Sequence, residues 1–202
     1  GVQTCALPIC MSNNIGDWPM VMIEWLNNCG ISGPRAQEWG ICYDKECHRV
    51  VIPKLNRAGK LVQYQSRRLA DDGTPKYLTN KLKREHIHDP IGPGKSKECI
   101  IVEDMISAIR LALCGYDAIP LFTDKMSNET MLTLVGRYDR IIVWLDNDSA
   151  VVDRHADEMI RALRLIDQEA WKIEGLRDPK HYTDVELHDA ITDFVPVIRR
   201  LK

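Results

Sequence analysis

The chain has 202 residues, of which 45% are hydrophobic and 28% charged, with a formal net charge of -2 at pH 7. This length and composition predict a globular protein of one domain or two closely joined subdomains. The sequence contains no apolar run long enough to cross a bilayer and no basic segment leading into an apolar stretch, so we expect a cytoplasmic protein without a membrane partner. Seven cysteines without a CxxC pair are expected to be reduced thiols.

The chain begins with GVQTCALPI, which matches the translation of a widely used sequencing-adapter oligonucleotide. We therefore expect residues 1–10 to be an adapter-derived or disordered leader, with Met11 as a candidate start. Beyond it, a basic subdomain is predicted at residues 11–97 and a second domain at residues 98–202.

The first of these regions predicts one short helix and one antiparallel hairpin. PMVMIEWLNN at residues 19–28, with Gly30 behind it, has the pattern and the glycine stop of a helix. The runs RVVIP and KLVQYQSRRL are rich in β-forming residues and flank a turn at residues 56–59, which favours a hairpin. A polar linker with proline and glycine is predicted at about residues 81–98.

Positive charge concentrates on this hairpin and the segment that follows it. From Arg49 to Arg84 there are ten Lys or Arg against two Asp, a balance of +8, so the remainder carries -10. A basic surface beside an acidic metal site would give this asymmetry, and so would a solvated surface of mixed charge.

From residue 98 the pattern alternates between strands and helices. The expected strands are CIIV, AIPLF, IIVWL and AWKIE, and the expected helices are MISAIRLALCG, SNETMLTLVGRY and residues 151–166. Strands and helices with short connections predict a parallel sheet covered by helices. The predicted fold class is therefore α/β, with a smaller α+β basic subdomain ahead of the parallel sheet.

Acidic residues follow two of the predicted strands. Glu103 comes after CIIV, and Asp146 and Asp148 come after IIVWL. Ligands gather at the carboxyl ends of parallel strands, and side chains two residues apart in an extended chain point the same way. Three converging carboxylates need a cation, and hard oxygen ligands suit Mg²⁺ or Mn²⁺. Helix capping by Asp148 or Ser149, with Glu103 at a helix N-terminus, is the alternative.

These acidic segments resemble the TOPRIM domain of bacterial and phage primases, topoisomerases and some nucleases. IIVEDMISAI and IIVWLDNDSA match its two motifs, a glutamate after one strand and DxD after another. LRDPKHYTDVEL resembles the third acidic stretch of primase TOPRIM domains, which implies Asp178 as a further metal ligand and Lys180 as a phosphate contact. Asp104 stands where many family members have glycine.

The basic segment is similar to the subdomain that precedes TOPRIM in bacterial and bacteriophage-type DNA primases. The resemblance lies in RVVIPKLNRAGKLVQYQSRRL followed by TPKYL, and with the acidic motifs it covers about residues 18–187. It implies contacts to template or nucleotide from Arg49, Arg67, Lys76, Tyr77 and Asn80.

The resemblance implies the catalytic core of a primase, a nucleotidyltransferase that makes short RNA primers on single-stranded DNA during phage replication. Its substrates would be ribonucleoside triphosphates, its cofactor Mg²⁺ or Mn²⁺ held by the catalytic Glu103, Asp146 and Asp148, and its helicase a separate chain. Two alternatives stay open. A TOPRIM nuclease would cut phosphodiesters with the same carboxylates, and a non-catalytic module would only bind single-stranded nucleic acid.

Overall fold

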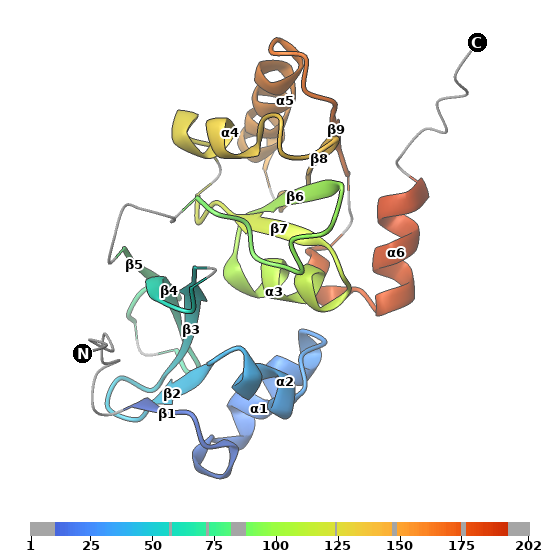
Figure 1. Cartoon of the computed structure of the whole chain (residues 1–202). Coiled ribbons are helices and arrows are strands. Elements are labelled where there is room, and N and C mark those ends of the chain that lie inside the picture. Colours follow the sequence, from blue (N-terminus) through green and yellow to red (C-terminus); the bar gives the residue numbers. More distant parts are fainter. Residues whose placement is uncertain are drawn as a thin grey trace. The chain divides into compact units, whose positions relative to one another are not determined.

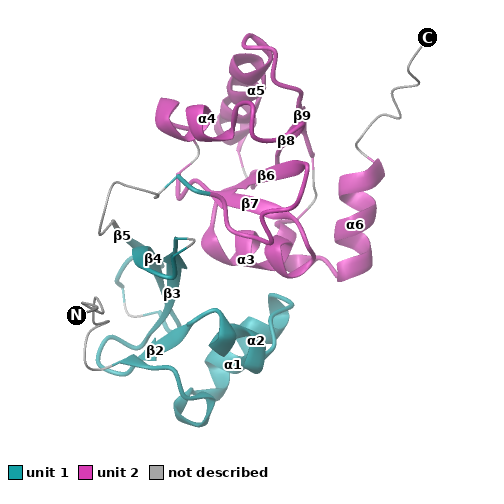
Figure 2. Ribbon diagram, in the orientation of Figure 1, with its two compact units in different colours: residues 1–89 teal, residues 90–202 magenta. Residues whose placement is uncertain are grey.

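The computed structural model describes residues 11–56, 58–71, 73–81, 88–123, 125–146, 149–174 and 177–193. The chain divides into two compact units, residues 1–89 and 90–202 (Figure 2). The leader predicted at residues 1–10 lies outside the described residues. Over the ranges given, no helix is both long and apolar enough to span a bilayer.

The first unit is built on a five-stranded antiparallel sheet in the order β1-β2-β3-β4-β5 (Figure 1). The strands are β1 (Met11–Ser12), β2 (Cys42–Asp44), β3 (Arg49–Leu55), β4 (Leu61–Arg68) and β5 (Tyr77–Lys81). The predicted hairpin is confirmed as β3 and β4. Its turn is closed by the Asn56 carboxamide, which accepts hydrogen bonds from the backbone N–H groups of Ala58 and Lys60 at 3.0 and 2.9 Å.

Helices η1 (Ile15–Asp17), α1 (Met20–Asn28) and α2 (Gly33–Glu38) complete this unit. Helix α1 confirms the prediction for residues 19–28, and Met22 and Leu26 on one of its faces are fully buried. Helix α2 was not predicted, because a Gly-Pro pair usually signals a loop. Here Pro34 lies in the first turn of the helix, where its missing N–H group needs no partner.

The second unit is built on a four-stranded parallel sheet in the order β7-β6-β8-β9. Its strands are β6 (Glu98–Val102), β7 (Asp117–Pro120), β8 (Arg140–Val143) and β9 (Ala170–Lys172). Its helices are α3 (Met105–Leu113), α4 (Asn128–Leu134), α5 (Ala150–Arg164), η2 (Pro179–His181) and α6 (Asp184–Asp193). The predicted mixed α/β class is thus confirmed.

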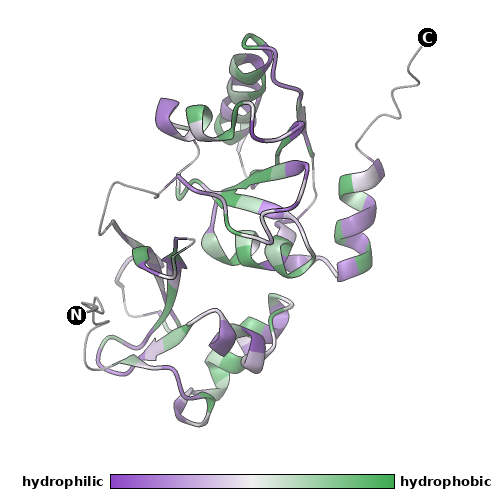
Figure 3. Cartoon of the chain, viewed as in Figure 1, coloured by the Kyte–Doolittle hydropathy of each residue, from purple (hydrophilic) through white to green (hydrophobic). Residues whose placement is uncertain are grey.

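Both faces of the parallel sheet are covered, as Figure 1 shows with α3 on one side and α4 and α5 on the other. Ile101 and Val143 pack into a cluster with Met159 and Leu163 of α5. The alternate side chains Ile100 and Ile142 are equally buried and point to the opposite face, where α3 packs on β6 and β7. The strands accordingly stand out as hydrophobic in Figure 3. Because both faces are buried by apolar side chains, polar groups of the sheet can gather at the ends of the strands.

Part of the predicted linker is built into the second unit instead. Ile91 is buried and pairs with Ala118 of β7 through two backbone hydrogen bonds of 2.7 and 2.8 Å. Gly94 then donates its N–H to the buried carboxylate of Asp117 at 2.8 Å. The linker interpretation was wrong for these residues, because their partners lie more than twenty positions away and leave no local pattern.

Gly92 stands in this segment with a φ of +136°, and a Cβ there would lie 2.5 Å from the carbonyl oxygen of Tyr116. We expect Gly92→Ala to lower the free energy of unfolding by about 1–3 kcal/mol through backbone strain alone, with the clash adding to it. Urea unfolding followed by circular dichroism measures the loss. The control is Gly59→Ala in the hairpin turn, where φ is +71° but no atom lies within 4 Å. Equal losses in both variants would show that the close approach to Tyr116 carries no weight.

Candidate active site at the carboxyl edge of the parallel sheet

Two of the predicted acidic residues follow neighbouring parallel strands. Glu103 comes directly after β6 and Asp146 three residues after β8, and Ile101 of β6 is in register with Val143 of β8. The two carboxyl groups therefore lie at the same edge of the sheet, and the charge of Glu103 is close enough to help raise the pKa of Asp146. Asp148 lies outside the described residues.

Asp178, which the family resemblance placed near this edge, forms a hydrogen bond with Asp146. Burial, the hydrogen bond and the charge of Asp178 raise the pKa of Asp146 to about 8. Burial alone would raise the pKa of Asp178 too, but the hydrogen bonds from Asp146 and Lys180 outweigh it and hold that pKa below its usual value. Asp146 is thus the proton-carrying partner of the pair.

Burial is the largest cause of the raised pKa of Asp146, and the charges of Asp178 and Glu103 add to it. The donors are hard carboxylate oxygens, which is the chemistry that Mg²⁺ and Mn²⁺ prefer. Within the part of the chain that the structure describes, no three Asp, Glu, His or Cys side chains already form a metal-binding group. Glu103, Asp146 and Asp178 are the described residues at this edge that could hold such an ion.

Lys180 lies within this acidic group, with its side chain only 8% exposed. Its ammonium group is 2.5 Å from Oδ2 of Asp104 and also contacts Oδ2 of Asp178. Burial would lower the pKa of Lys180, but the charges and hydrogen bonds of the two carboxylates outweigh it and hold that pKa above the usual range. The residue is charged and already paired.

Helix capping, the alternative interpretation of the acidic motifs, is confirmed for Ser149, and Glu103 stands directly ahead of the N-cap of α3. Asp104 caps α3 by accepting a hydrogen bond from the Ser107 N–H at 2.7 Å, and Ser149 caps α5 by accepting one from the Val152 N–H at 3.3 Å. Neither Glu103 nor Asp146 makes these capping hydrogen bonds itself.

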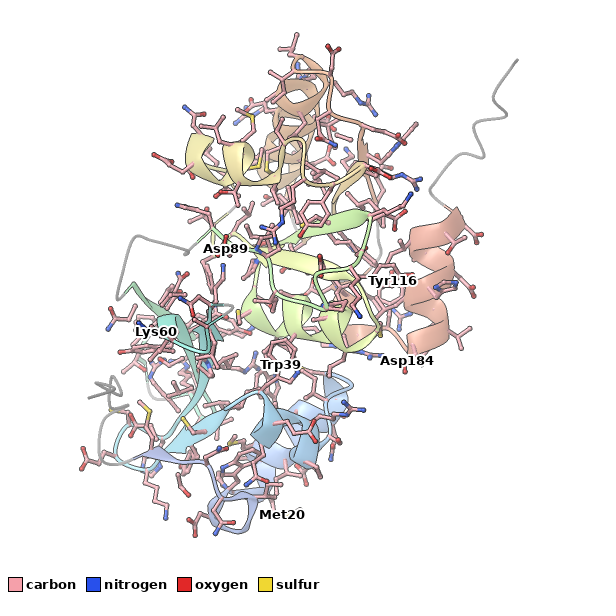
Figure 4. All side chains as sticks on the ribbon, in the orientation of Figure 1. Met20, Trp39, Lys60, Asp89, Tyr116 and Asp184 are labelled. Atoms are coloured by element: carbon pink, nitrogen blue, oxygen red, sulfur yellow. The ribbon has the colours of Figure 1, made fainter. Side chains whose placement is uncertain are left out.

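The segment that carries Asp178 and Lys180 is held from two sides. The Tyr182 ring meets the ring of Trp144 edge to face at 5.2 Å, and Trp144 stands between β8 and Asp146. Arg110 of α3 donates a hydrogen bond to the Tyr182 carbonyl oxygen at 3.0 Å and pairs with Asp184, which Figure 4 labels at the start of α6. Sequence reasoning did not single out Arg110 or Tyr182, because these partners lie more than seventy residues apart.

Asp146 also lines a hollow between α5 and the end of β9. Its walls are Leu145, Asp146, Val152, Asp153, Ala156, Lys172, Ile173 and Glu174. At its rim Lys172 bonds to Asp153 at 2.9 Å and to Asp157 at 2.7 Å, which ties the first turns of α5 to the sheet. This tie fixes the helix that follows the loop carrying Asp146.

In the first unit, three of the predicted binding residues gather into a basic and aromatic cluster of Trp25, Arg67, Lys76 and Tyr77. The guanidinium carbon of Arg67 lies 4.5 Å from the centre of the Trp25 ring, and its Nη1 donates to the Tyr77 hydroxyl at 2.6 Å. The ammonium of Lys76 lies 5.6 Å from the Tyr77 ring. Trp25 is the member that the sequence did not predict as a binding residue.

Arg49 and Asn80 stand on the opposite face of the same sheet. Arg49 is in register with Arg68 and not with Arg67, so its side chain points away from the cluster. It is buried and donates hydrogen bonds to Oγ1 of Thr74 at 2.8 Å and to the carbonyl oxygen of Pro75 at 2.7 Å. Asn80 donates to the Tyr64 hydroxyl at 2.7 Å. The five residues therefore do not form one surface.

No known family profile matches the chain, and no curated protein sequence matches it. Solved structures do match in fold. An Aquifex aeolicus primase with zinc-binding and RNA polymerase domains superposes with a TM-score of 0.67 and 17% identity over 84% of this chain and 55% of that one. A DNA primase domain from Pseudomonas aeruginosa superposes with a TM-score of 0.66 and 19% identity, over 86% of this chain and 70% of that one. The E. coli primase catalytic core superposes with a TM-score of 0.63 and 17% identity, over 86% of this chain and 72% of that one.

The chain thus spans 55% of the length of the Aquifex aeolicus protein. Two further matches are primase domains bound to nucleic acid. One is a DnaG catalytic domain with single-stranded DNA, at a TM-score of 0.55 and 20% identity, and the other is the Mycobacterium tuberculosis RNA polymerase domain with double-stranded DNA, at 0.61 and 16%. The two units of this chain, in this order, have the fold of the DNA primase catalytic core.

Proposed function

We propose that this chain is the catalytic core of a bacteriophage-type DNA primase, which joins ribonucleoside triphosphates into short RNA primers on single-stranded DNA. The observation that carries the proposal is the hydrogen-bonded pair of Asp146 and Asp178, with the charge of Glu103 nearby, at one edge of a parallel sheet in a chain with the primase-core fold. The primase domain solved with single-stranded DNA supports this choice of template.

The proposed reaction is phosphoryl transfer, in which the 3′ hydroxyl of one ribonucleotide attacks the α-phosphate of the next and pyrophosphate leaves. Bound Mg²⁺ or Mn²⁺ would supply Lewis-acid stabilisation of the charge on the phosphates. Glu103, Asp146 and Asp178 would hold the ion, together with Asp148. Asp146 would give up its proton to do so, since an ionised carboxylate is the ligand. A replicative helicase on a separate chain is part of the same proposal.

In the first unit, Arg67, Lys76 and Tyr77 would contact the template or the incoming nucleotide, with Asn80 doing so from the other face of the sheet. Trp25 and the Tyr77 hydroxyl fix the guanidinium of Arg67, so little conformational freedom is left to lose on binding. Arg49, proposed as a further contact, also anchors residues 74–75 directly ahead of Lys76.

An incorporation assay with labelled ribonucleotides, single-stranded templates and either Mg²⁺ or Mn²⁺ tests the proposal. Labelled oligomers longer than a dinucleotide are the expected product. Shortened template would instead indicate the TOPRIM nuclease, and retention of template without either product would indicate a binding module. The match to primase cores over both units favours synthesis, because a nuclease needs only the acidic edge.

Lys76→Met is expected to weaken single-strand binding about fivefold near 0.1 M salt and to reduce the slope of log K against log salt by about 0.7, the effect of one lost phosphate contact. Fluorescence anisotropy of a labelled oligonucleotide over a salt series measures both values. The control is Lys60→Met, an exposed lysine at the other end of the β3–β4 hairpin (Figure 4). If the slope is the same in the Lys76 variant as in the unmodified protein, Lys76 makes no phosphate contact.

A further inference from the structure

Lys180 places a positive charge inside the acidic edge of the second unit. Its side chain is 8% exposed, and its partners Asp104 and Asp178 are only 11% and 21% exposed. Charged lysines are rarely buried unless they are paired, so the ion pairs with Asp104 and Asp178 are what allow Lys180 to be buried. A cation of the protein's own therefore stands between Asp178 of the proposed metal site and the neighbouring carboxylate of Asp104.

We propose that the ammonium group of Lys180 takes the place of a second divalent ion, so that the acidic edge holds a single Mg²⁺ or Mn²⁺ in the absence of nucleotide. The inference rests on the proposed function only in requiring that this edge binds metal. It concerns how many ions the protein binds by itself.

Hydrogen bonds already engage the oxygens that an ion seated between Asp104 and Asp178 would need. Asp104 accepts the Ser107 N–H with Oδ1 and Lys180 with Oδ2, so both of its oxygens are engaged. Asp178 gives Oδ2 to Lys180 and is also hydrogen-bonded to Asp146. A metal would then be held by carboxyl oxygens of Glu103, Asp146 and Asp178.

Charge leads to the same conclusion. A divalent ion seated on Asp104 and the Lys180 side of Asp178 would lie within a few ångströms of the ammonium group, in a partly buried place where repulsion between like charges is strong. A second ion is therefore opposed.

The ammonium group is also fixed where it lies. Helix η2, which contains Lys180, packs against α3, and Asp104 is the N-cap of that helix. On the C-terminal side, Arg110 of α3 binds the carbonyl oxygen of Tyr182. A side chain held at both ends of its short helix cannot easily leave for a solvent-exposed rotamer when metal arrives.

Counting bound Mn²⁺ tests the inference. Titration of the full chain with Mn²⁺, followed by electron paramagnetic resonance of the free ion, should give one ion per chain for the unmodified protein and two for Lys180→Met. Lys180→Arg, which keeps the charge, should again give one. A count of two on the unmodified protein, or of one on the methionine variant, would overturn the inference, and the first of these does not depend on how any variant folds.

Thermal unfolding provides a second measurement, because Lys180→Met leaves two carboxylates without their cation. Its melting temperature should fall without metal and rise with Mn²⁺ by more than that of the unmodified protein. If Lys180 is a phosphate contact instead, the variant should keep one ion and lose affinity for inorganic triphosphate, which also rejects the inference. Asp146→Asn separates the two proposals: if it still binds Mn²⁺ with the original affinity, the metal site of the proposed function is wrong.

Discussion

Asp146→Asn should reduce primer synthesis at least about a thousandfold, equivalent to roughly 4 kcal/mol of activation free energy, while the protein stays folded. The reason is that the asparagine amide cannot become the anionic ligand that a divalent cation requires. It can still donate a hydrogen bond to Asp178, as the protonated carboxyl group does, so the contact between the two side chains survives. We expect the free energy of unfolding to change by less than about 0.5 kcal/mol.

The incorporation assay measures the rate, and urea unfolding measures the stability. Asp139→Asn is the matched control, because Asp139 stands just before β8, at the opposite end of the strand that leads to Asp146. Its ion pair with Lys97 is exposed, at 73% and 84%, so this variant should synthesise primers normally. Primer synthesis at the unmodified rate by Asp146→Asn would refute the assignment of the acidic edge.

Trp144→Ala is expected to lower the free energy of unfolding by about 3–5 kcal/mol, which is the usual cost of removing a large buried aromatic side chain. Trp144 is only 1% exposed and has the largest of the fully buried side chains in the described chain. Trp144 lies between β8 and Asp146, and its ring packs against the ring of Tyr182, two residues after Lys180. The loss should therefore extend to synthesis, which we expect to fall at least tenfold at temperatures where the variant remains folded.

Trp144→Phe keeps an aromatic ring in the same space and should cost less than about 1.5 kcal/mol. No hydrogen bond is lost with the indole, because its Nε1 has no partner among the described residues. Trp171→Ala, at a partly exposed position on β9, is the control for removing a tryptophan. Urea unfolding of the three variants ranks them, and equal stability of Trp144→Ala and Trp171→Ala would mean that the packing against Tyr182 contributes nothing.

The sequence predicted most of the elements that position the candidate site. Helix α1, the β3–β4 hairpin and the alternation from β6 to β9 all have strong local patterns, and each was placed within a few residues. The predicted helix at residues 151–166 is α5, with Ala156, Met159, Ile160 and Leu163 buried on one face as expected. Regular spacing of apolar residues was enough, because burial of one face decides these elements.

The remaining features depend on contacts between distant residues. The sequence marked Asp104 only as a departure from a family pattern, whereas the structure gives it a partner in Lys180. Helix α6 was missed because its apolar residues are few, and Leu187 and Ile191 are the ones it buries. Strand β5 was not predicted, since its pairing with β4 is what makes it a strand. The contacts to nucleic acid and metal stay predictions.

The pairing of Ile91 with Ala118 has a consequence for how the second unit behaves in solution. Strand β7 is an outer strand of the parallel sheet, and an outer strand with open N–H and C=O groups can recruit a strand from another molecule. Ile91 uses both backbone groups of Ala118, and Pro120 at the end of β7 has no N–H to offer. Ile91, ahead of β6, thus occupies backbone groups of β7 through which a strand of another molecule could pair.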